Sequence, residues 1–145
     1  MEIKPQFGLD KLLFGMKKQH IEQFYGQADA EFKDEDENQI LVYNQLKARL
    51  TLYADEDFRL GYIVLSHPDA QIKNEKIIGK KITDAKQLVQ KMGMQKFEEE
   101  SFDTITNYFN EDYWMILQAE YGEIVKVEIG AIIKNQDEFD WKFQA

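Results

Sequence analysis

Two stretches of the chain repeat the same order of apolar residues, and this internal echo constrains the fold more than any other feature. Gly15 and Gly79, which are 64 positions apart, obey the same offset. The aligned segments are Leu50-Thr51-Leu52-Tyr53 with Trp114-Met115-Ile116-Leu117, followed by Leu60, Ile63 and Leu65 with Ile124, Val127 and Ile129. Self-similarity at a fixed offset is typical of a duplicated supersecondary unit. The sequence therefore predicts two copies of one module.

Each copy begins with a pattern typical of a short amphipathic helix. The apolar stripes at helical spacing are Ile21, Phe24 and Tyr25 in the first copy and Ala85, Leu88, Val89 and Met92 in the second. Gly26 and Gly93 are placed to end these helices, and Thr83 is the expected N-cap of the second. Helices this short need a sheet to pack against.

Alternating apolar and polar residues after each helix predict strands. We expect them near residues 31–33, 39–43, 48–54 and 59–65, and again near 95–98, 104–109, 113–119 and 123–133. The predicted fold is α+β: two tandem helix-then-antiparallel-meander units form one curved sheet with the helices on one face. The chain is expected to be one compact domain (1–145) with repeat units at 13–72 and 77–133. An aromatic C-terminal strand or arm occupies 134–145, where Phe139, Trp141 and Phe143 alternate with polar residues.

Composition and charge narrow the classes of function. The chain is 43% apolar and 13% aromatic, which is enough for a packed core and too apolar for a disordered chain. A net charge of −9 argues against nucleic acid and anionic membranes as partners and allows electrostatic steering onto a basic protein. The alternative is that the acidity only aids solubility. The absence of cysteine excludes disulfides and thiolate sites. With no leader-like start and no membrane-length apolar run, a cytoplasmic location is expected.

Candidate catalytic and metal sites are weak. His67 stands in the turn Ser66-His67-Pro68-Asp69, where neighbours in sequence cannot converge as a catalytic relay. The acidic run that starts at Asp34 would need Gly at position 39 and Glu at 45 to bind calcium as an EF-hand loop, but Gln39 and Gln45 stand there. The sequence therefore predicts no catalytic residue, no metal and no cofactor.

Alternation assigns the two faces of the predicted sheet. The side chains expected to point to the helices are Leu50, Leu52, Leu60, Ile63, Leu65, Trp114, Ile116, Ile124, Val127 and Ile129. The opposite face, which we predict to bind a partner, would carry Arg49, Thr51, Tyr53, Tyr62, Val64, Tyr113, Met115, Leu117, Lys126 and Glu128. Tyrosine and methionine are enriched at protein interfaces, so this face is unusual for one that only contacts water.

The segment Gly15-Met16-Lys17-Lys18, with Ile21, Phe24 and Gly26-Gln27-Ala28-Asp29, resembles the helix motif of the β-lactamase-inhibitor-protein-like fold. Small outer-membrane assembly lipoproteins share that motif, in which a proline stands at the position of Ala28. The second copy keeps Gly79 and Gly93 but lacks the methionine and the Pro-Asp ending. The resemblance implies tandem helix-plus-sheet units whose joined sheets grip another protein. The lipoprotein branch would need a leader and a cysteine.

The sequence thus predicts a non-catalytic module that masks or inhibits a partner protein through an open, tyrosine-rich sheet face. An immunity protein that neutralises a basic toxin domain is one inhibitor of this kind. Three alternatives stay open: a domain that binds a small apolar ligand, a structural subunit whose open face is buried in a homodimer, and a face covered by the chain's own aromatic arm. The predicted oligomeric state is accordingly monomer or homodimer.

Overall fold

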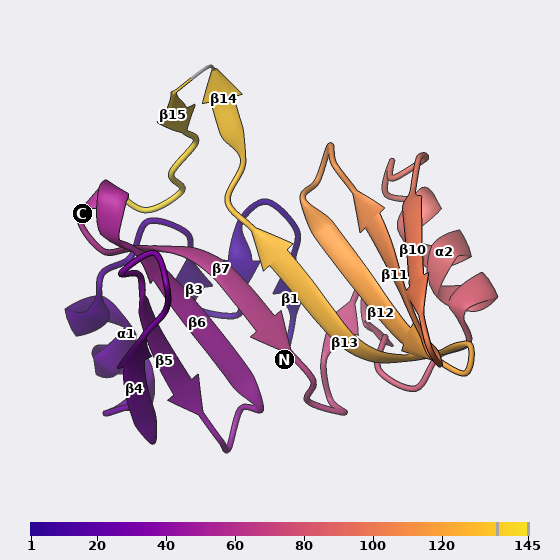
Figure 1. Cartoon of the computed structure of the whole chain (residues 1–145), viewed down its shortest axis with the longest axis horizontal. Helices are drawn as coiled ribbons and strands as arrows, with labels where there is room; N and C mark the ends of the chain where they lie inside the picture. Colours follow the sequence, from indigo (N-terminus) through magenta and orange to yellow (C-terminus); the bar gives the residue numbers. More distant parts are fainter. Residues whose placement is uncertain (136, 145) are drawn as a thin grey trace.

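The computed structural model describes residues 1–135 and 137–144. Its main body is an antiparallel sheet with the strand order β10-β11-β12-β13-β7-β6-β5-β4 (Figure 1). Two meanders, each consecutive in sequence, form this sheet and join where β7 pairs with β13. The first consists of β4 (Ala30–Lys33), β5 (Gln39–Tyr43), β6 (Ala48–Tyr53) and β7 (Arg59–Leu65). The second consists of β10 (Glu98–Phe102), β11 (Ile105–Asn110), β12 (Met115–Glu120) and β13 (Glu123–Gly130).

The remaining elements are short. The chain begins with a small sheet of β1 (Ile3–Lys4), β2 (Gly8–Leu9) and β3 (Leu12–Leu13), followed by α1 (Lys18–Tyr25). A hairpin of β8 (Gln71–Ile72) and β9 (Glu75–Lys76) precedes α2 (Ile82–Gln90), and a 3₁₀ turn (Ala54–Glu56) links β6 to β7. The C-terminal hairpin pairs β14 (Ile133–Asn135) with β15 (Glu138–Phe139). Over the described residues, neither helix has the length and apolarity needed to cross a bilayer.

Alternation gives the central strands of the sheet one buried face. In β6, Ala48, Leu50 and Leu52 are buried while the residues between them are exposed or half-buried. The neighbouring strand β7 contributes Leu60, Ile63 and Leu65 to the same buried face. A register shift between Thr51 and Leu52 keeps both sets on one face.

One continuous core lies beneath the sheet. It joins residues of both meanders, of both helices and of the short β segments, including Leu9, Phe14, Ile21, Ile72 and Val89. These short segments matter because Leu12 and Phe14 are fully buried, as are Ile72 and Ile77 from the β8–β9 region. The N-terminal residues are therefore an integral layer of the fold.

The predicted α+β fold class, with two helix-then-meander units and helices covering one face, is wrong. Strands account for 45% of the residues and helices for only 14%, so the protein is mostly β. The physical reason is that helices of eight and nine residues cannot cover an eight-stranded sheet. Short β segments supply buried side chains that the prediction had assigned to helices. The expected N-cap of the second helix is also wrong: Lys81 occupies that position and Thr83 lies inside α2.

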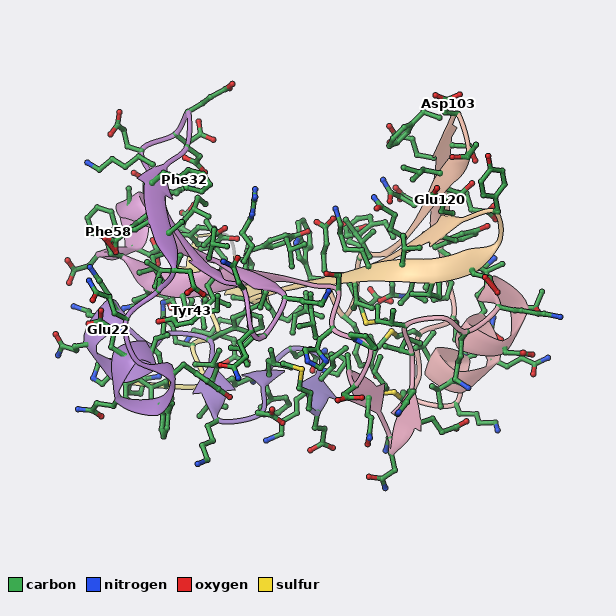
Figure 2. The ribbon with its side chains drawn as sticks, turned by 90° about the horizontal axis from the view of Figure 1, so that it is seen from below. Glu22, Phe32, Tyr43, Phe58, Asp103 and Glu120 are labelled. Atoms are coloured by element: carbon green, nitrogen blue, oxygen red, sulfur yellow. The ribbon has the colours of Figure 1, made fainter. Side chains whose placement is uncertain are left out.

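The large sheet is curved, and its two ends rise on the side away from the helices (Figure 2). We call this side the concave face. Cross-strand register and alternation place its members: Phe32, Ile40, Val42, Arg49, Thr51, Tyr53, Tyr62, Val64, Glu98, Glu100, Asn107, Phe109, Trp114, Ile116, Gln118, Lys126 and Glu128. Residues from both meanders thus face a common hollow.

The aromatic arm predicted at 134–145 packs at one end of this face; positions 136 and 145 lie outside the described residues. The ring of Phe139 lies 5.7 Å from that of Tyr53 and stacks on Trp141 at 4.8 Å. The backbone N–H groups of Lys142 and Phe143 both donate to the carbonyl oxygen of Phe14. The arm therefore covers the Tyr53 end of the concave face, while Phe32 (44% exposed) and Trp114 (39% exposed) stay accessible.

Candidate functional site

The concave face brings together seven of the ten predicted partner-binding residues. They come from three neighbouring strands at the centre of the sheet, which pair directly across Arg49, Val64 and Glu128. The seven are Arg49, Thr51, Tyr53, Tyr62, Val64, Lys126 and Glu128. None of these side chains belongs to the core on the opposite side.

The other three predicted residues point the opposite way. Met115 and Leu117 are fully buried in the core, so their predicted place on the open face is wrong. The hydroxyl of Tyr113 donates to the carbonyl oxygen of Met92 at 2.8 Å, just beyond α2. Trp114 and Ile116, expected to point to the helices, lie on the concave face instead.

A one-residue error in the β11–β12 hairpin explains this exchange. The run from Trp114 to Leu117 is continuously apolar, so alternation within it cannot decide which residues are buried. Trp114 has a positive φ of 50° and belongs to the loop, which fixes the phase of β12 from Met115 onward. A shift of one residue moves every side chain of a strand to the other face.

Around Trp114 the concave face deepens into a hollow of about 520 Å³, which we call the aromatic pocket. Residues of both meanders line it: Tyr53, Tyr62, Glu98, Glu99, Glu100, Asn107, Phe109, Trp114 and Ile116. Four of these nine are aromatic, three are glutamates, and none is lysine or arginine. Apolar walls with a few polar groups are typical of ligand-binding pockets of this size.

Two glycines let aromatic rings lie flat on the sheet. A Cβ atom added at Gly130 would collide with the ring of Trp114, and one added at Gly61 would collide with the ring of Tyr53. The Trp114 ring also meets Phe109 edge to face, with ring centroids 5.1 Å apart. These contacts hold a bulky side chain whose backbone has left-handed geometry, which ordinarily costs about 1–3 kcal/mol.

Asn110 organises the loop that presents Trp114. It is the buried polar residue at the end of β11, only 1% exposed. Its Oδ1 accepts the backbone N–H of Tyr113 at 2.8 Å, and its Nδ2 donates to the carbonyl oxygen of Lys96 at 2.9 Å. The amide thus ties the β11–β12 loop to the segment that leads into β10.

The tyrosines of the aromatic pocket are held as neutral groups. Burial, followed by a 2.5 Å hydrogen bond that Tyr62 donates to Oε1 of Glu128, raises the pKa of Tyr62 far above its usual range. Burial alone raises the pKa of Tyr53 to about 12. Both rings therefore present uncharged aromatic surface, and Tyr62 fixes the carboxylate of Glu128 beside it.

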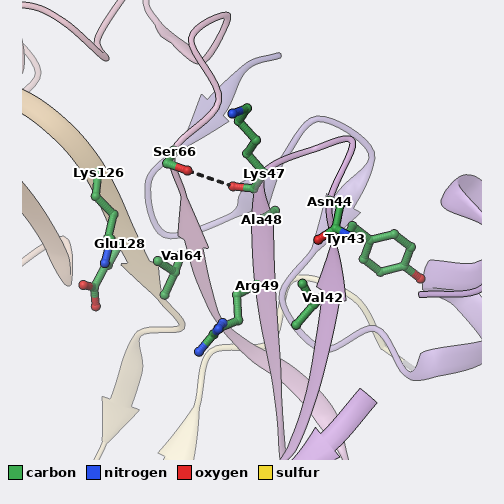
Figure 3. A pocket seen from close by; sticks show the side chains of 10 residues that line it. All are labelled: Val42, Tyr43, Asn44, Lys47, Ala48, Arg49, Val64, Ser66, Lys126 and Glu128. Carbon is green, nitrogen blue, oxygen red and sulfur yellow. Dashed lines mark hydrogen bonds between the residues drawn. The ribbon is translucent and has the colours of Figure 1, made fainter. Parts of the chain in front are cut away.

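A second hollow of about 580 Å³ lies along β5, β6, β7 and β13 (Figure 3). Four predicted residues line it, namely Arg49, Val64, Lys126 and Glu128. The remaining lining residues are Val42, Tyr43, Asn44, Lys47, Ala48 and Ser66. The guanidinium carbon of Arg49 lies 5.6 Å from the ring centre of Phe32, so a cation already packs on an aromatic ring of this face.

The raised ends of the sheet are acidic. At one end the β4–β5 loop carries Asp34, Glu35, Asp36 and Glu37. At the other, Asp103 lies between β10 and β11 and Glu120 ends β12 (Figure 2). Because these carboxylates flank the hollow, an approaching cationic surface is attracted before it makes contact.

The two candidate sites that the sequence raised, the acidic loop and the His67 turn, have local structural roles. Over residues 1–135 and 137–144, no three His, Asp or Glu side chains gather as a metal site. The predicted acidic loop closes on itself: Oδ1 of Asp34 accepts the backbone N–H groups of Asp36 and Asn38, each at 2.9 Å. Nδ1 of His67 accepts the N–H of Asp69 at 3.0 Å within its turn.

Sequence reasoning missed Glu98, Glu100, Phe109, Trp114 and Ile116 as members of the concave face. One signal could have found the last two. In β12, Gln118 and Glu120 share the phase of Ile116, whereas Ala119 shares the phase of Met115 and Leu117. Polar residues mark the solvent side of a half-buried strand, so alternation over the whole strand gives the correct face.

Comparison with known proteins identifies no family: no protein-family model and no curated protein matches the chain. Among solved structures, the chain is similar to an extracellular protein containing a SCP domain from Bacillus anthracis str. Ames, known at 1.5 Å resolution. The TM-score is 0.54 with 14% identical residues over 79% of this chain and 42% of that one. The chain thus spans less than half of that protein, and the likeness concerns the fold alone.

Proposed function

We propose that the protein is a non-catalytic binding module whose concave face grips a basic partner protein. The observation that carries the proposal is the combination of exposed aromatic residues in a concave sheet with carboxylates on both raised ends. Phe32 and Trp114 are large apolar side chains left accessible on the same face. Phe32 lies on β4 and Trp114 next to β12, so accessible aromatic rings stand toward both ends of the face, and aromatic residues are enriched at protein interfaces.

The net negative charge of the chain favours a positively charged protein as the partner on the concave face. The chain has 27 acidic and 18 basic residues, for a net charge of −9. Complementary fields raise the association rate of two proteins and suppress wrong partners. An immunity-type protein that neutralises a basic toxin domain is the specific form of this proposal that size and charge favour.

Site-specific photo-cross-linking tests the proposal. A photoreactive amino acid placed at Ile116, on the concave face, should yield a covalent adduct with one partner in cells of the native host. The matched control is the same amino acid at Gln87, an exposed position of α2. The protein partner should be identified by mass spectrometry and the complex then rebuilt from the two purified chains.

The rebuilt complex decides the matter. Calorimetric titration should give saturable binding that Phe32→Ala and Trp114→Ala each weaken by at least about 1 kcal/mol, as for aromatic interface residues. Adducts that form equally from position 87, or a rebuilt mixture that does not bind, would contradict the proposal. A symmetric homodimer in sedimentation equilibrium, with the Ile116 adduct formed between two copies, would contradict it as well.

A further inference from the structure

The aromatic pocket differs from the rest of the concave face in the sign of its charges. Three glutamates line it and no lysine or arginine does, whereas Lys47, Arg49 and Lys126 line the neighbouring hollow. Glu99 pairs with Lys86 on the other side of the sheet, so the pocket combines aromatic walls with the carboxylates of Glu98 and Glu100. We propose that the aromatic pocket is the subsite for an arginine side chain of the partner, an inference that rests on the proposed function for the source of that arginine.

The carboxylates of Glu98 and Glu100 carry the first part of the argument. They are two residues apart on β10, so both side chains project to the concave face, opposite Phe109 and Asn107. Within the described chain neither carboxylate makes a hydrogen bond or an ion pair. Glu99, between them, directs its carboxylate to the other side, where its Oε2 lies 3.6 Å from Nζ of Lys86.

The aromatic rings carry the second part. Trp114 and Phe109 meet edge to face, and the Trp114 side chain stays 39% exposed at the pocket. Cations bind over aromatic faces, and tryptophan is the strongest of the aromatic partners. Tyr62 adds an uncharged ring whose hydroxyl is already bonded to Glu128.

An arginine side chain can bind the carboxylates and the aromatic rings at the same time. Its guanidinium is planar, stacks on aromatic rings and presents forked donors that match a carboxylate in two parallel hydrogen bonds. A lysine ammonium is a compact, strongly hydrated charge that does not stack on a ring and does not form two parallel hydrogen bonds to one carboxylate. The face already holds one guanidinium against a ring, Arg49 over Phe32, which shows the same chemistry in the same sheet.

A nuclear magnetic resonance titration tests this inference on the full chain. The probe is the blocked peptide acetyl-Gly-Arg-Gly-amide, observed through the side-chain indole N–H signals of Trp114 and Trp141. We expect a saturable shift of the Trp114 signal, with the Trp141 signal unchanged because that ring packs on Phe139 in the arm. The same peptide with citrulline, a neutral isostere, should bind at least about tenfold more weakly.

Matched charge variants distinguish a specific arginine site from general electrostatic attraction to an acidic protein. Glu98→Gln with Glu100→Gln should weaken the arginine peptide at least about tenfold. Glu35→Gln with Glu120→Gln removes the same total charge from the two raised ends and should leave binding within about twofold. The inference would be overturned by equal losses in both pairs of variants or by equal binding of the citrulline peptide. Tighter binding of the same peptide with lysine in place of arginine would overturn it as well.

The two proposals can fail separately. If the cross-linked partner binds but the Glu98→Gln and Glu100→Gln pair leaves its affinity unchanged, the arginine subsite is wrong and the binding module stands. If the arginine peptide binds as expected but position 116 captures no partner, the pocket retains its preference for a cation and the protein-binding function is wrong.

Discussion

At the scale of single residues, the concave face depends on glycines that leave room for rings. Gly130 lies beneath Trp114, and an added Cβ would also come within 3.1 Å of Cδ1 of Tyr62. Both rings belong to the aromatic pocket, so this one missing side chain shapes two of its walls. Gly130 ends the central strand β13, and a glycine within a sheet often marks a site of close approach.

We therefore predict that Gly130→Ala lowers the free energy of unfolding by about 1–3 kcal/mol, because the new methyl group must displace the Trp114 ring. Urea unfolding measures this change. In the Trp114→Ala background the same substitution should cost less than about 1 kcal/mol, since the obstructing ring is gone. Equal costs in the two backgrounds would mean that the ring is not what occupies this space.

Tyr53 predicts a dependence of stability on alkaline pH. Its pKa is raised by burial from 10.0 to about 12, so between these values the unfolded chain loses a proton that the folded protein keeps. The contribution of Tyr53 to stability is therefore constant below pH 10 and falls as the pH rises toward 12, by at most about 2–3 kcal/mol. Denaturant unfolding at a series of pH values measures the fall.

The variant Tyr53→Phe should remove that share of the alkaline loss, because phenylalanine has no proton to release. The control Tyr121→Phe changes a side chain that is 80% exposed and should leave the loss in place. An alkaline profile that is identical in wild type and Tyr53→Phe would show that the buried hydroxyl does not contribute.

At the scale of elements, the β11–β12 hairpin decides which side chains reach the concave face. Asn110→Ala removes both hydrogen bonds of the buried amide and leaves the N–H of Tyr113 and the carbonyl of Lys96 without that partner. We expect a loss of about 1–3 kcal/mol in unfolding free energy and a changed near-ultraviolet signal from Trp114.

Asn107→Ala is the matched control, because Asn107 lies in the same strand and accepts one 3.0 Å hydrogen bond from Gln118 at the half-buried surface. Its loss should stay below about 1 kcal/mol and leave the Trp114 signal unchanged. A larger loss in Asn107→Ala than in Asn110→Ala would show that the loop does not depend on the buried amide.

Both helices and seven of the eight strands of the large sheet could be predicted from local pattern; β10, expected near residues 95–98, lies at Glu98–Phe102. Periodicity gave α1 and α2 near their observed bounds. Gly26 caps α1 as expected, whereas α2 ends at Gln90 with Lys91 as its C-cap, before Gly93. The two-residue strands β1, β2, β3, β8 and β9 could not be found, since segments that short have no period. Their omission led to the wrong fold class.

The internal repeat in the sequence corresponds to related hairpins and not to helix-and-sheet units. Gly15 N–H donates to the carbonyl of Leu60, and Gly79 N–H donates to that of Ile124, so the offset of the glycines and of β7 and β13 agrees. The 64-residue offset does not hold for β6 and β12, because the loop between β6 and β7 is longer than the loop between β12 and β13. Because the prediction applied the same offset to β12, it placed Met115 and Leu117 on the wrong face. The short apolar run around these two residues does not reveal the difference in loop length.

At the scale of the whole molecule, the proposed site exists only if both meanders stay together. Glu98, Phe109 and Trp114 come from the second meander, whereas Tyr53 and Tyr62 come from the first. The seam between them is the pairing of β7 with β13, where Ile63 lies opposite Ile129 above a core common to both halves. A single core should make the two halves unfold as one unit.

Ile63→Ala tests that expectation, because the side chain is 1% exposed at the seam. We predict a loss of about 2–5 kcal/mol in unfolding free energy and an equal drop in hydrogen-exchange protection for amides of β5 and β11, in opposite halves. Ile105→Ala, half-buried in β11, should cost less at both places. Protection lost in β5 but kept in β11 would show two independent halves, and a pocket built across the seam would then lack a fixed shape.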